Sequence, residues 1–424
     1  MAKVTSELIK KAHSAQVAAR ELRSLSTDKK NAALMAIADA LDANHTSILK
    51  ANAADMDAGR ESGLSEAVLG RLLLDESRLR AMASDLRIVA QLPDPVGERF
   101  DARTLANGIK IERRRVPLGV IGCVYESRPN VTTDIAALCL KSGNAIVLRG
   151  GKEAVHSNNA LVGLIKDSLG RVEITRDAVQ FVGDTDRTVV DQMIRLTEYL
   201  DLFIPRGGEG LIKHVRDNAT VPSITGGIGV VHVYVDSSAD VAKAEEIVVN
   251  AKTQRPDVCN ALDTLLVHSA IAPSVLPPTA LKLAAAGVEL RCDQRALSLI
   301  GPMNGAKVRQ AAPGDFGQEF LSLVMSVRVV DSMEVAIEHI EEHGSGHTEA
   351  IVAEDDSAAM RFIDEVEAAV VLVNASTRFN DGGQLGLGAE VAISTNKLHA
   401  RGPMGLRELT SYKWVALGEG QIRP

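Results

Sequence analysis

The sequence predicts an α/β protein made of two parallel-sheet domains, with a helical region at the start of the chain and a β-hairpin arm. Length is the first observation, because 424 residues exceed one typical domain of about 100 to 200 residues. The second is that short β-branched runs alternate with helical stretches from 117 to 236 and again from 237 to 374. Such alternation is typical of βαβ units, whose parallel sheets carry helices on both faces.

Composition excludes several classes of protein. With 46% hydrophobic and 24% charged residues, the chain is typical of a globular protein. The 47 basic residues against 55 acidic ones give a formal net charge of −8, which argues against sequence-independent binding to nucleic acid. No apolar run reaches the roughly 18 residues of a membrane span, and the N-terminus lacks the apolar core of a signal peptide. We therefore expect a cytoplasmic protein with no nucleic-acid or membrane partner.

The first elements in chain order are helices, followed by a hairpin. Residues 1–97 have helical apolar spacings such as Leu34, Ile37 and Leu41, with Thr27 and Asp28 placed to cap that helix. In 98–116, Asn107-Gly108 separates two alternating segments, which predicts a hairpin with a type I′ turn. We expect 98–116 and the Gly-rich tail 375–424 to form an arm that is buried against another subunit, giving at least a dimer.

The two α/β domains follow from their candidate strands. Residues 1–97 and 117–236 should form the first domain, and 237–374 the second. The expected strands are 119–125, 145–148, 179–182 and 230–235 in the first domain, and 262–267, 321–330, 350–353 and 370–373 in the second.

Several glycine-containing loops follow these strands. Gly143 is expected to end a helix in the left-handed conformation. The strand 145–148 runs into Arg149-Gly150-Gly151-Lys152, where exposed amides and two cations would suit a phosphate-bearing ligand, the alternative being a solvated basic turn. Gly207 and Gly208 open another helix and again suit an anion, whereas Gly226 and Gly227 could be a bare turn.

Cys259 is the strongest candidate for a nucleophile. Pro256 disfavours helix at Arg255, so the cysteine should lie on a fixed loop before a strand, with Lys252 and Arg255 near enough to lower the pKa of its thiol. The other three cysteines are expected to be structural: Cys123 and Cys139 lie in apolar runs, and Cys292 should be half-buried. None of the four has metal-binding spacing, so reduced thiols are expected.

A metal site is the rival interpretation. His339-Ile340-Glu341-Glu342-His343 satisfies the H-x-x-E-H pattern of some zinc peptidases, and His347 adds a third imidazole. However, Gly344-Ser345-Gly346 ends that helix at once, which places His343 where a cation favours the helix dipole. We therefore expect capping or packing histidines and no metal.

The order of these motifs resembles the aldehyde dehydrogenase superfamily over essentially the whole chain. The strings that carry the resemblance are Tyr-Glu-Ser-Arg-Pro-Asn at 125–130, Leu-Arg-Gly-Gly-Lys-Glu at 148–153, Val-Cys-Asn-Ala at 258–261, the segment 336–351, Gly-Leu-Gly-Ala-Glu at 386–390, and Leu-His-Ala-Arg-Gly-Pro-Met-Gly-Leu at 398–406. More closely, the chain resembles the branch that reduces L-glutamyl 5-phosphate with NADPH to glutamate 5-semialdehyde and phosphate in proline biosynthesis. The H-x-x-E-H string then belongs to the signature of that branch.

The resemblance implies roles for particular residues. The thiolate of Cys259 would attack the acyl phosphate, and a hydride from NADPH would reduce the resulting thioester. Either Arg128 or Asn130 would stabilise the oxyanion. The hydrolytic relatives carry a general-base Glu before their Gly-Gly turn, but this chain has Ile224 and Thr225 there, so water activation is lost as reduction requires.

The same resemblance implies an NADP(H) site and partners. Arg149 and Lys152 would bind the 2′-phosphate of the cofactor, and Glu319 would bind a ribose. The remaining cofactor-binding positions would be Gly150, Gly151, Gly207, Gly208, Gly226 and Gly227. The implied partners are a homo-oligomer and a glutamate 5-kinase that could channel the unstable acyl phosphate. A reductase acting on an acyl thioester and a metal-dependent hydrolase remain as alternatives.

Overall fold

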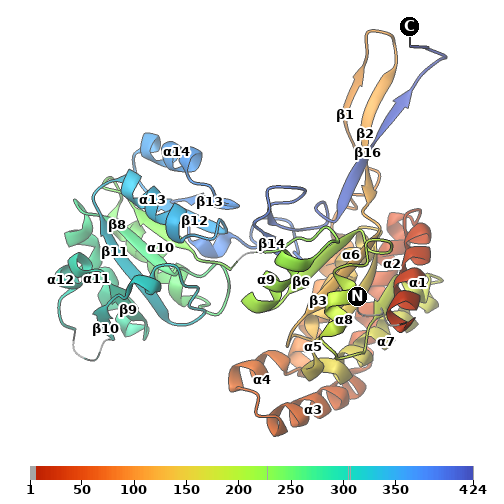
Figure 1. Cartoon of the computed structure of the whole chain (residues 1–424), viewed down its shortest axis with the longest axis horizontal. Coiled ribbons are helices and arrows are strands. Elements are labelled where there is room, and N and C mark those ends of the chain that lie inside the picture. Colours follow the sequence, from red (N-terminus) through yellow and green to blue (C-terminus); the bar gives the residue numbers. More distant parts are fainter. Residues whose placement is uncertain (1–5, 227, 304, 306, 424) are drawn as a thin grey trace. The chain divides into compact units, whose positions relative to one another are not determined.

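The computed structural model describes residues 6–226, 228–303, 305 and 307–423. The chain divides into two units (Figure 1). Unit 1 comprises Met1–Thr225, Gly386–Ala392 and Met404–Pro424, and unit 2 comprises Gly226–Leu385 and Ile393–Pro403. Within the described residues, no helix has both the length and the apolarity to cross a membrane.

Unit 1 contains a parallel sheet in the order β5-β4-β3-β6. Its strands are β3 (Val120–Tyr125), β4 (Ala145–Gly150), β5 (Val179–Phe181) and β6 (Leu202–Arg206). Every residue of β3 and β4 is buried, as expected for central parallel strands covered on both faces. The strands expected at 119–125, 145–148 and 179–182 are therefore present.

Helices surround this sheet. In chain order they are α1 (Ser6–Leu22), α2 (Thr27–Ala43), α3 (His45–Glu61), α4 (Glu66–Leu72), α5 (Glu76–Gln91), α6 (Asn130–Lys141), α7 (Val155–Arg171), α8 (Thr188–Met193) and α9 (Glu209–Asn218), with 3₁₀ turns η1 (Lys152–Ala154) and η2 (Arg176–Ala178). Helix α1 contacts β3, β4 and β5, α6 contacts β4, and α7 contacts β5. Gly143 follows α6 with φ of 76°, as the sequence predicted.

The cap of α2 differs from expectation. Ser26 is the N-cap, and its hydroxyl accepts the backbone N–H of Lys29 at 3.3 Å. Thr27 is instead the first helical residue, and its hydroxyl donates to Asp94 at 3.0 Å. The prediction that Thr27 and Asp28 cap the helix was wrong by one to two residues, because the residue with extended backbone is Ser26.

A three-stranded antiparallel ribbon projects from unit 1 (Figure 1). Its strands are β1 (Arg99–Thr104), β2 (Lys110–Pro117) and β16 (Thr410–Leu417), so the tail of the chain pairs with the expected hairpin. The turn is not type I′, because only Gly108 is left-handed, with φ of 85°. The Gly108 N–H donates to the Leu105 carbonyl at 2.9 Å, which closes a four-residue turn.

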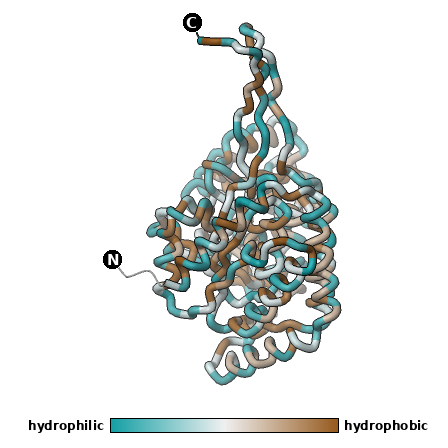
Figure 2. Tube along the Cα trace, turned by 90° about the vertical axis from the view of Figure 1, so that its right-hand side faces the viewer, coloured by the Kyte–Doolittle hydropathy of each residue, from teal (hydrophilic) through white to brown (hydrophobic). Residues whose placement is uncertain are grey.

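The ribbon carries both hydrophilic and hydrophobic residues along its length (Figure 2). The guanidinium of Arg113 lies 4.7 Å from the ring centroid of Tyr412 and 4.6 Å from that of Trp414. Tyr412 and Trp414 are nevertheless 45% and 50% exposed. Aromatic surface on an exposed ribbon is typical of a contact surface.

Unit 2 contains a seven-stranded parallel sheet in the order β10-β9-β11-β8-β7-β12-β13. The strands are β7 (His232–Val235), β8 (Thr264–His268), β9 (Glu289–Cys292), β10 (Val308–Gln310), β11 (Val324–Val330), β12 (Thr348–Val352) and β13 (Val370–Val373). The helices are α10 (Val241–Thr253), α11 (Ala272–Ala285), α12 (Gln294–Ile300), α13 (Met333–His343) and α14 (Asp356–Glu365), with η3 (Pro313–Asp315), η4 (Thr377–Phe379) and a short pair β14 (Ile393–Ser394) and β15 (Gly402–Pro403).

Helices cover both faces of this sheet. Val233 and Val235 of β7 belong to a core cluster that includes residues of α10, α11 and α12. Tyr234 belongs to a second cluster with residues of α13 and α14. Because adjacent strand residues point to opposite faces, this alternation fills two hydrophobic cores from one strand.

The boundary expected at residue 236 was wrong. Strand β7 pairs with β8 and β12 of unit 2, so the second unit begins at Gly226. Strands β9 and β10 were not predicted, and β11 begins at Val324 rather than Leu321, where φ is 49°. The other strands expected in the second domain are present within a few residues.

We predict that Lys30→Met lowers the free energy of unfolding by about 3 kcal/mol, because it leaves a buried carboxylate without its closest cation. Lys30 Nζ lies 2.9 Å from Asp94 Oδ2, with side chains 1% and 7% exposed. The control is Lys29→Met, whose partner Glu173 is 89% exposed, and its effect should stay within about 0.5 kcal/mol. Urea unfolding measures both, and equal effects of the two substitutions would contradict the prediction.

Candidate functional site

Cys259 is the accessible thiol among the four cysteines. It lies between α10 and β8 and is partly exposed, whereas Cys123, Cys139 and Cys292 are buried. Burial raises the thiol pKa of Cys123 and Cys292 to about 12 and raises that of Cys139 well above its usual value. Cys292, expected to be half-buried, is fully buried on β9 because it faces a hydrophobic core of unit 2.

A buried ion pair joins the two ends of the Cys259 loop. Lys252, near the end of α10, and Asp263, just before β8, are 0% and 2% exposed, and Lys252 Nζ lies 3.7 Å from Asp263 Oδ1. Burial raises the pKa of Asp263 to about 7 and lowers the pKa of Lys252 to about 8. Arg255 lies 3.4 Å from Asp257. The two cations expected to act on the thiol therefore each have a carboxylate partner.

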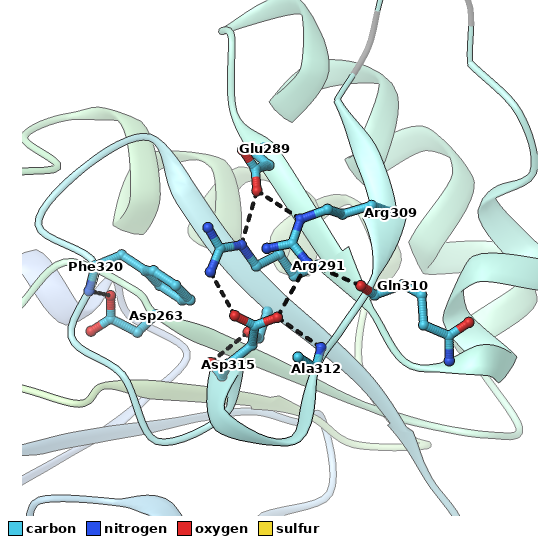
Figure 3. Close-up of polar contacts among 9 residues, drawn as sticks. Asp263, Glu289, Arg291, Arg309, Gln310, Ala312, Asp315 and Phe320 are labelled. Carbon is cyan, nitrogen blue, oxygen red and sulfur yellow. Dashed lines mark hydrogen bonds and ion pairs between the residues drawn. The ribbon is translucent and has the colours of Figure 1, made fainter.

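Asp263 also connects the loop to two other segments. Its Oδ1 accepts the N–H of Phe320 at 3.0 Å, and its Oδ2 accepts the N–H of Val231 at 3.4 Å. Figure 3 shows the Phe320 contact beside a network of charged side chains. Glu319, the neighbour of Phe320, accepts the N–H of Gly229 on its Oε1 at 3.0 Å. The structure thus brings Glu319 into the same unit as Cys259 and next to the segment that leads into β7.

The glycine turn before β7 allows close backbone packing. A Cβ on Gly229 would clash with the carbonyl oxygen, carbonyl carbon and Cα of Cys259. A Cβ on Gly226 would clash with the carbonyl oxygen of Ile393. Gly227 lies outside the described residues. These glycines fix the backbone around the candidate nucleophile, a role that the sequence analysis did not assign to them.

Arg378 is a cation that the sequence analysis missed. It lies on η4, and its Nε donates to the side-chain oxygen of Gln254 at 2.8 Å, at the start of the Cys259 loop. Burial lowers the pKa of Arg378, and the charges of Asp381, Cys259 and Asp257 act in the opposite direction. The available signal was an arginine in an otherwise Gly-rich tail that follows a predicted strand.

Unit 1 provides a separate candidate site at the carboxyl ends of β3, β4 and β6. Ligands of open parallel sheets bind at such edges, where strand order reverses. Arg149 ends β4 but is only 7% exposed, and its Nη2 donates to the backbone oxygens of Thr185 at 2.7 Å and Asp186 at 3.4 Å. Burial lowers the pKa of Arg149. Lys152, by contrast, is exposed.

At this edge of the sheet, acidic side chains fill the space beside the glycines. The Glu126 carboxylate accepts the N–H of Gly208 at 3.0 Å, and a Cβ on Gly207 would clash with it. The anion at the N-terminus of α9 is therefore a side chain of the protein itself. Similarly, Glu153 accepts the N–H of Ser127 at 2.6 Å and its hydroxyl at 2.9 Å.

Gly150 and Gly151 are closely packed by side chains. A Cβ on Gly151 would clash with the carboxylate of Glu153, and one on Gly150 would clash with the amide of Asn158. Both positions are therefore closely packed even before a ligand is considered. The clashing groups are the ends of side chains, which can move aside more easily than backbone.

The two candidate oxyanion residues belong to unit 1, whereas Cys259 belongs to unit 2. Arg128 lies in the loop after β3 and is half-buried. Asn130 begins α6, and its side-chain amide donates to Asp134 at 2.8 Å. Burial raises the pKa of Asp134 to about 7. The role of Arg128 or Asn130 remains a prediction.

The H-x-x-E-H histidines lie in a packed aromatic cluster. His339 is buried, its ring centroid lies 4.5 Å from that of His343, and its Nδ1 lies 2.6 Å from Arg328 Nη1. Burial lowers the pKa of His339 to about 2, and the pKa of the buried His347 to about 4. No group of three potential metal ligands is found among the residues that the structure describes.

Comparison with known proteins identifies relatives along the whole chain. Residues 1–312 match the model of the aldehyde dehydrogenase family. A gamma-glutamyl phosphate reductase of Dehalococcoides mccartyi is 53% identical over 423 residues, which cover 100% of both chains. One from Roseiflexus castenholzii is 54% identical, covering 96% of this chain and 97% of the relative.

Solved structures confirm the predicted fold class. The crystal structure of gamma-glutamyl phosphate reductase from Thermotoga maritima is similar with a TM-score of 0.96 and 47% identity, covering 99% of this chain and 100% of that one. An acetylating aldehyde dehydrogenase from Geobacillus thermoglucosidasius has a TM-score of 0.68 at 19% identity, covering 99% and 98% of the two chains, and shares the fold.

We predict that Gly229→Ala lowers the free energy of unfolding by about 2 kcal/mol, because the new methyl group meets fixed backbone rather than a movable side chain. Amide hydrogen exchange across 254–261 should become faster. The control is Gly163→Ala in α7, which meets no atom within 4 Å and should stabilise by about 0.5 to 1 kcal/mol. A Gly229→Ala protein with wild-type stability and exchange would contradict the prediction.

Proposed function

Because the chain belongs to the aldehyde dehydrogenase family, we propose that it reduces L-glutamyl 5-phosphate with NADPH to L-glutamate 5-semialdehyde, NADP⁺ and phosphate. This is the second step of proline biosynthesis from glutamate. The substrate assignment rests on the full-length similarity to relatives named gamma-glutamyl phosphate reductase. The observation that carries the mechanism is one accessible cysteine on a loop held by a buried ion pair.

In the proposed mechanism, the Cys259 thiolate attacks the acyl carbon of the substrate. The carbon–sulfur bond forms, the carbon–oxygen bond to phosphate breaks, and inorganic phosphate leaves with the bonding electron pair. NADPH, when bound, supplies the hydride that reduces the resulting thioester. The thiohemiacetal anion then expels the thiolate and releases the aldehyde. Arg128 or Asn130 would donate to the oxyanion in both stages.

The residues before the glycine turn favour reduction over hydrolysis. Ile224 and Thr225 are 2% and 9% exposed, and neither side chain is a carboxylate that could activate water. A thioester on Cys259 would therefore persist until hydride arrives.

The carboxyl edge of the unit 1 sheet is suited to NADP(H). In the all-parallel order β5-β4-β3-β6, the order in which strands are added reverses beside β3, and a dinucleotide is expected to bind at such a point. Lys152 is exposed there and would bind the 2′-phosphate, while Arg149, already bonded to the 185–186 backbone, would support the edge. Glu319 would bind a ribose, as the family resemblance implies.

The ribbon of β1, β2 and β16 would be buried against a second copy of the chain. The exposure of Tyr412 and Trp414 supports this proposal, because apolar ribbon surface gains stability when it is buried. An association with a glutamate 5-kinase stays a prediction from the resemblance.

The function is tested by oxidation of glutamate 5-semialdehyde with NADP⁺, measured as NADPH absorbance. We expect turnover to require inorganic phosphate or arsenate, because one of them must accept the acyl group. Cys259→Ala should lower kcat at least about a thousandfold. Cys292→Ala, at a buried cysteine of the same unit, should retain kcat.

Other outcomes would support the rival functions. Phosphate-independent turnover with an acyl-thioester acceptor would point to a thioester reductase. Activity that survives Cys259→Ser but is lost to a chelator would point to a metal-dependent hydrolase.

We predict that Lys152→Ala raises the KM for NADPH about tenfold or more and leaves the KM for NADH unchanged, because it removes one charged hydrogen bond to the 2′-phosphate. Arg149→Ala is the contrasting variant. It removes the anchor of the 185–186 backbone and should raise the KM for both cofactors by similar factors. Steady-state kinetics with each cofactor measures this, and an equal effect of Lys152→Ala on both would refute a role at the 2′-phosphate.

A further inference from the structure

Arg378 lies in residues 374–380 of unit 2, a segment that we call the platform because hydrogen bonds hold it at both ends. The residues that follow β13 are held by the side chain of Asn374, which accepts the N–H of Ala353 at 3.0 Å and donates to its carbonyl at 2.8 Å. Ser376 caps η4, and Asn380 donates to the hydroxyl of Thr348 at 2.7 Å. Because both ends of the segment are fixed to the sheet, the arginine between them has little freedom to move away.

Two hydrogen bonds hold this platform against the Cys259 loop. Arg378 Nε donates to Gln254, five residues before Cys259, at 2.8 Å. Asn260, immediately after Cys259, donates its side-chain amide to the carbonyl oxygen of Asn380 at 2.9 Å. The segment 378–380 therefore contacts the Cys259 loop on both sides of Cys259 in sequence, which brings Arg378 to the loop that carries the candidate nucleophile.

The guanidinium has unused donors. Among the described residues, the Arg378 side chain makes one hydrogen bond, from its Nε–H to Gln254. The N–H groups of its two Nη atoms therefore have no acceptor among those residues. Other arginines of unit 2 differ. Arg291 and Arg309 each contact both Glu289 and Asp315, and the four side chains form a closed network (Figure 3). Their charges are neutralised, whereas Arg378 is half-buried and donates to Gln254 at the start of the Cys259 loop.

The acidic residues around Arg378 are themselves engaged. Asp257 lies 3.4 Å from Arg255, and Asp381 accepts the N–H of Gly383 at 2.9 Å and of Gln384 at 3.2 Å. An anion brought to Arg378 would meet carboxylates whose charge is partly balanced. A planar guanidinium with free Nη groups is the geometry that binds two phosphate oxygens at once.

We propose that Arg378 binds the phosphoryl group of the acyl phosphate and the phosphate that leaves, and so sets the preference for an acyl phosphate substrate. This inference rests on the proposed function. As the thiolate adds to the acyl carbon, negative charge develops on the acyl oxygen. When the carbon–oxygen bond to phosphate then breaks, that charge passes to the departing phosphate, where a fixed cation stabilises it. In the reverse direction the same group holds inorganic phosphate for attack on the thioester.

The test uses oxidation of glutamate 5-semialdehyde by the full-length protein, with phosphate and semialdehyde varied separately. Arg378→Ala should raise the KM for phosphate at least tenfold and leave the KM for the semialdehyde within twofold. Arg378→Lys keeps the positive charge but lacks the paired N–H donors of the guanidinium, so it should give an intermediate KM for phosphate. The control is Arg295→Ala, which removes an exposed arginine of unit 2 that pairs with Asp331 and should leave both KM values unchanged.

A second measurement does not depend on turnover. Inorganic phosphate should slow the alkylation of Cys259 by iodoacetamide in the wild-type protein, and this protection should vanish in Arg378→Ala. A raised KM for the semialdehyde with an unchanged KM for phosphate would overturn the proposal and assign Arg378 to the substrate carboxylate. Wild-type turnover without phosphate would overturn the proposed function itself, so the two failures are distinguishable.

Discussion

The position of the candidate nucleophile depends on one buried carboxylate, Asp263. It pairs with Lys252 across the ends of the Cys259 loop and accepts backbone N–H groups from Phe320 and Val231. Three segments that are distant in sequence therefore meet at one side chain. Burying both charges costs solvation energy, and their mutual attraction offsets that cost only when both are present. The loss of solvation disfavours the charged form of each group, so burial raises the pKa of Asp263 and lowers that of Lys252. The pair defines the loop geometry rather than adding much net stability.

The same reasoning separates structural cations from cations that can bind a ligand. Lys252 is buried and faces a carboxylate, and Arg149 is buried and bonds to backbone oxygens. Both have been taken out of water to hold backbone in place. Lys152 is exposed and Arg378 is half-buried, so each keeps capacity for an anion. Spacing in the sequence does not distinguish these two kinds of cation, because the difference lies in what each side chain contacts after folding.

The sequence was sufficient for most strands of the two parallel sheets and for singling out the accessible cysteine. Fully buried strands such as β3 and β4 leave apolar β-branched runs. Cys123 lies in such a run and Cys139 in the apolar stretch of α6, whereas Cys259 lies outside both kinds of segment. Short strands left no such signal, so β9 and β10 were missed. The domain boundary was misplaced because β7 pairs with strands that come later in the chain, and strand order is a property of tertiary packing.

Glycine patterns were the least informative part of the site. Gly207 and Gly151 make room for the carboxylates of Glu126 and Glu153, and Gly229 makes room for the backbone of Cys259. A glycine that admits a neighbouring group and one that admits a phosphate have the same sequence signature. The tail illustrates the opposite difficulty. Arg378 lies in a stretch that the sequence analysis interpreted as loop, and only the hydrogen bonds that join the segment 378–380 to the Cys259 loop point to a function.

The carboxylates near Cys259 are also consistent with the proposed reduction. Glu319 has one oxygen engaged by the N–H of Gly229, and Asp263 is 2% exposed, so water has little access to it. The position that holds a general base in hydrolytic relatives carries an apolar side chain and a hydroxyl in this chain, at Ile224 and Thr225. In the proposed reaction, a thioester on Cys259 would meet the Arg378 cation, whereas Glu319 and Asp263 each accept a backbone N–H. In the proposed reaction, transfer of hydride or of phosphate is then favoured over hydrolysis. NADPH and phosphate need only be bound, whereas an attacking water must also be deprotonated by a base.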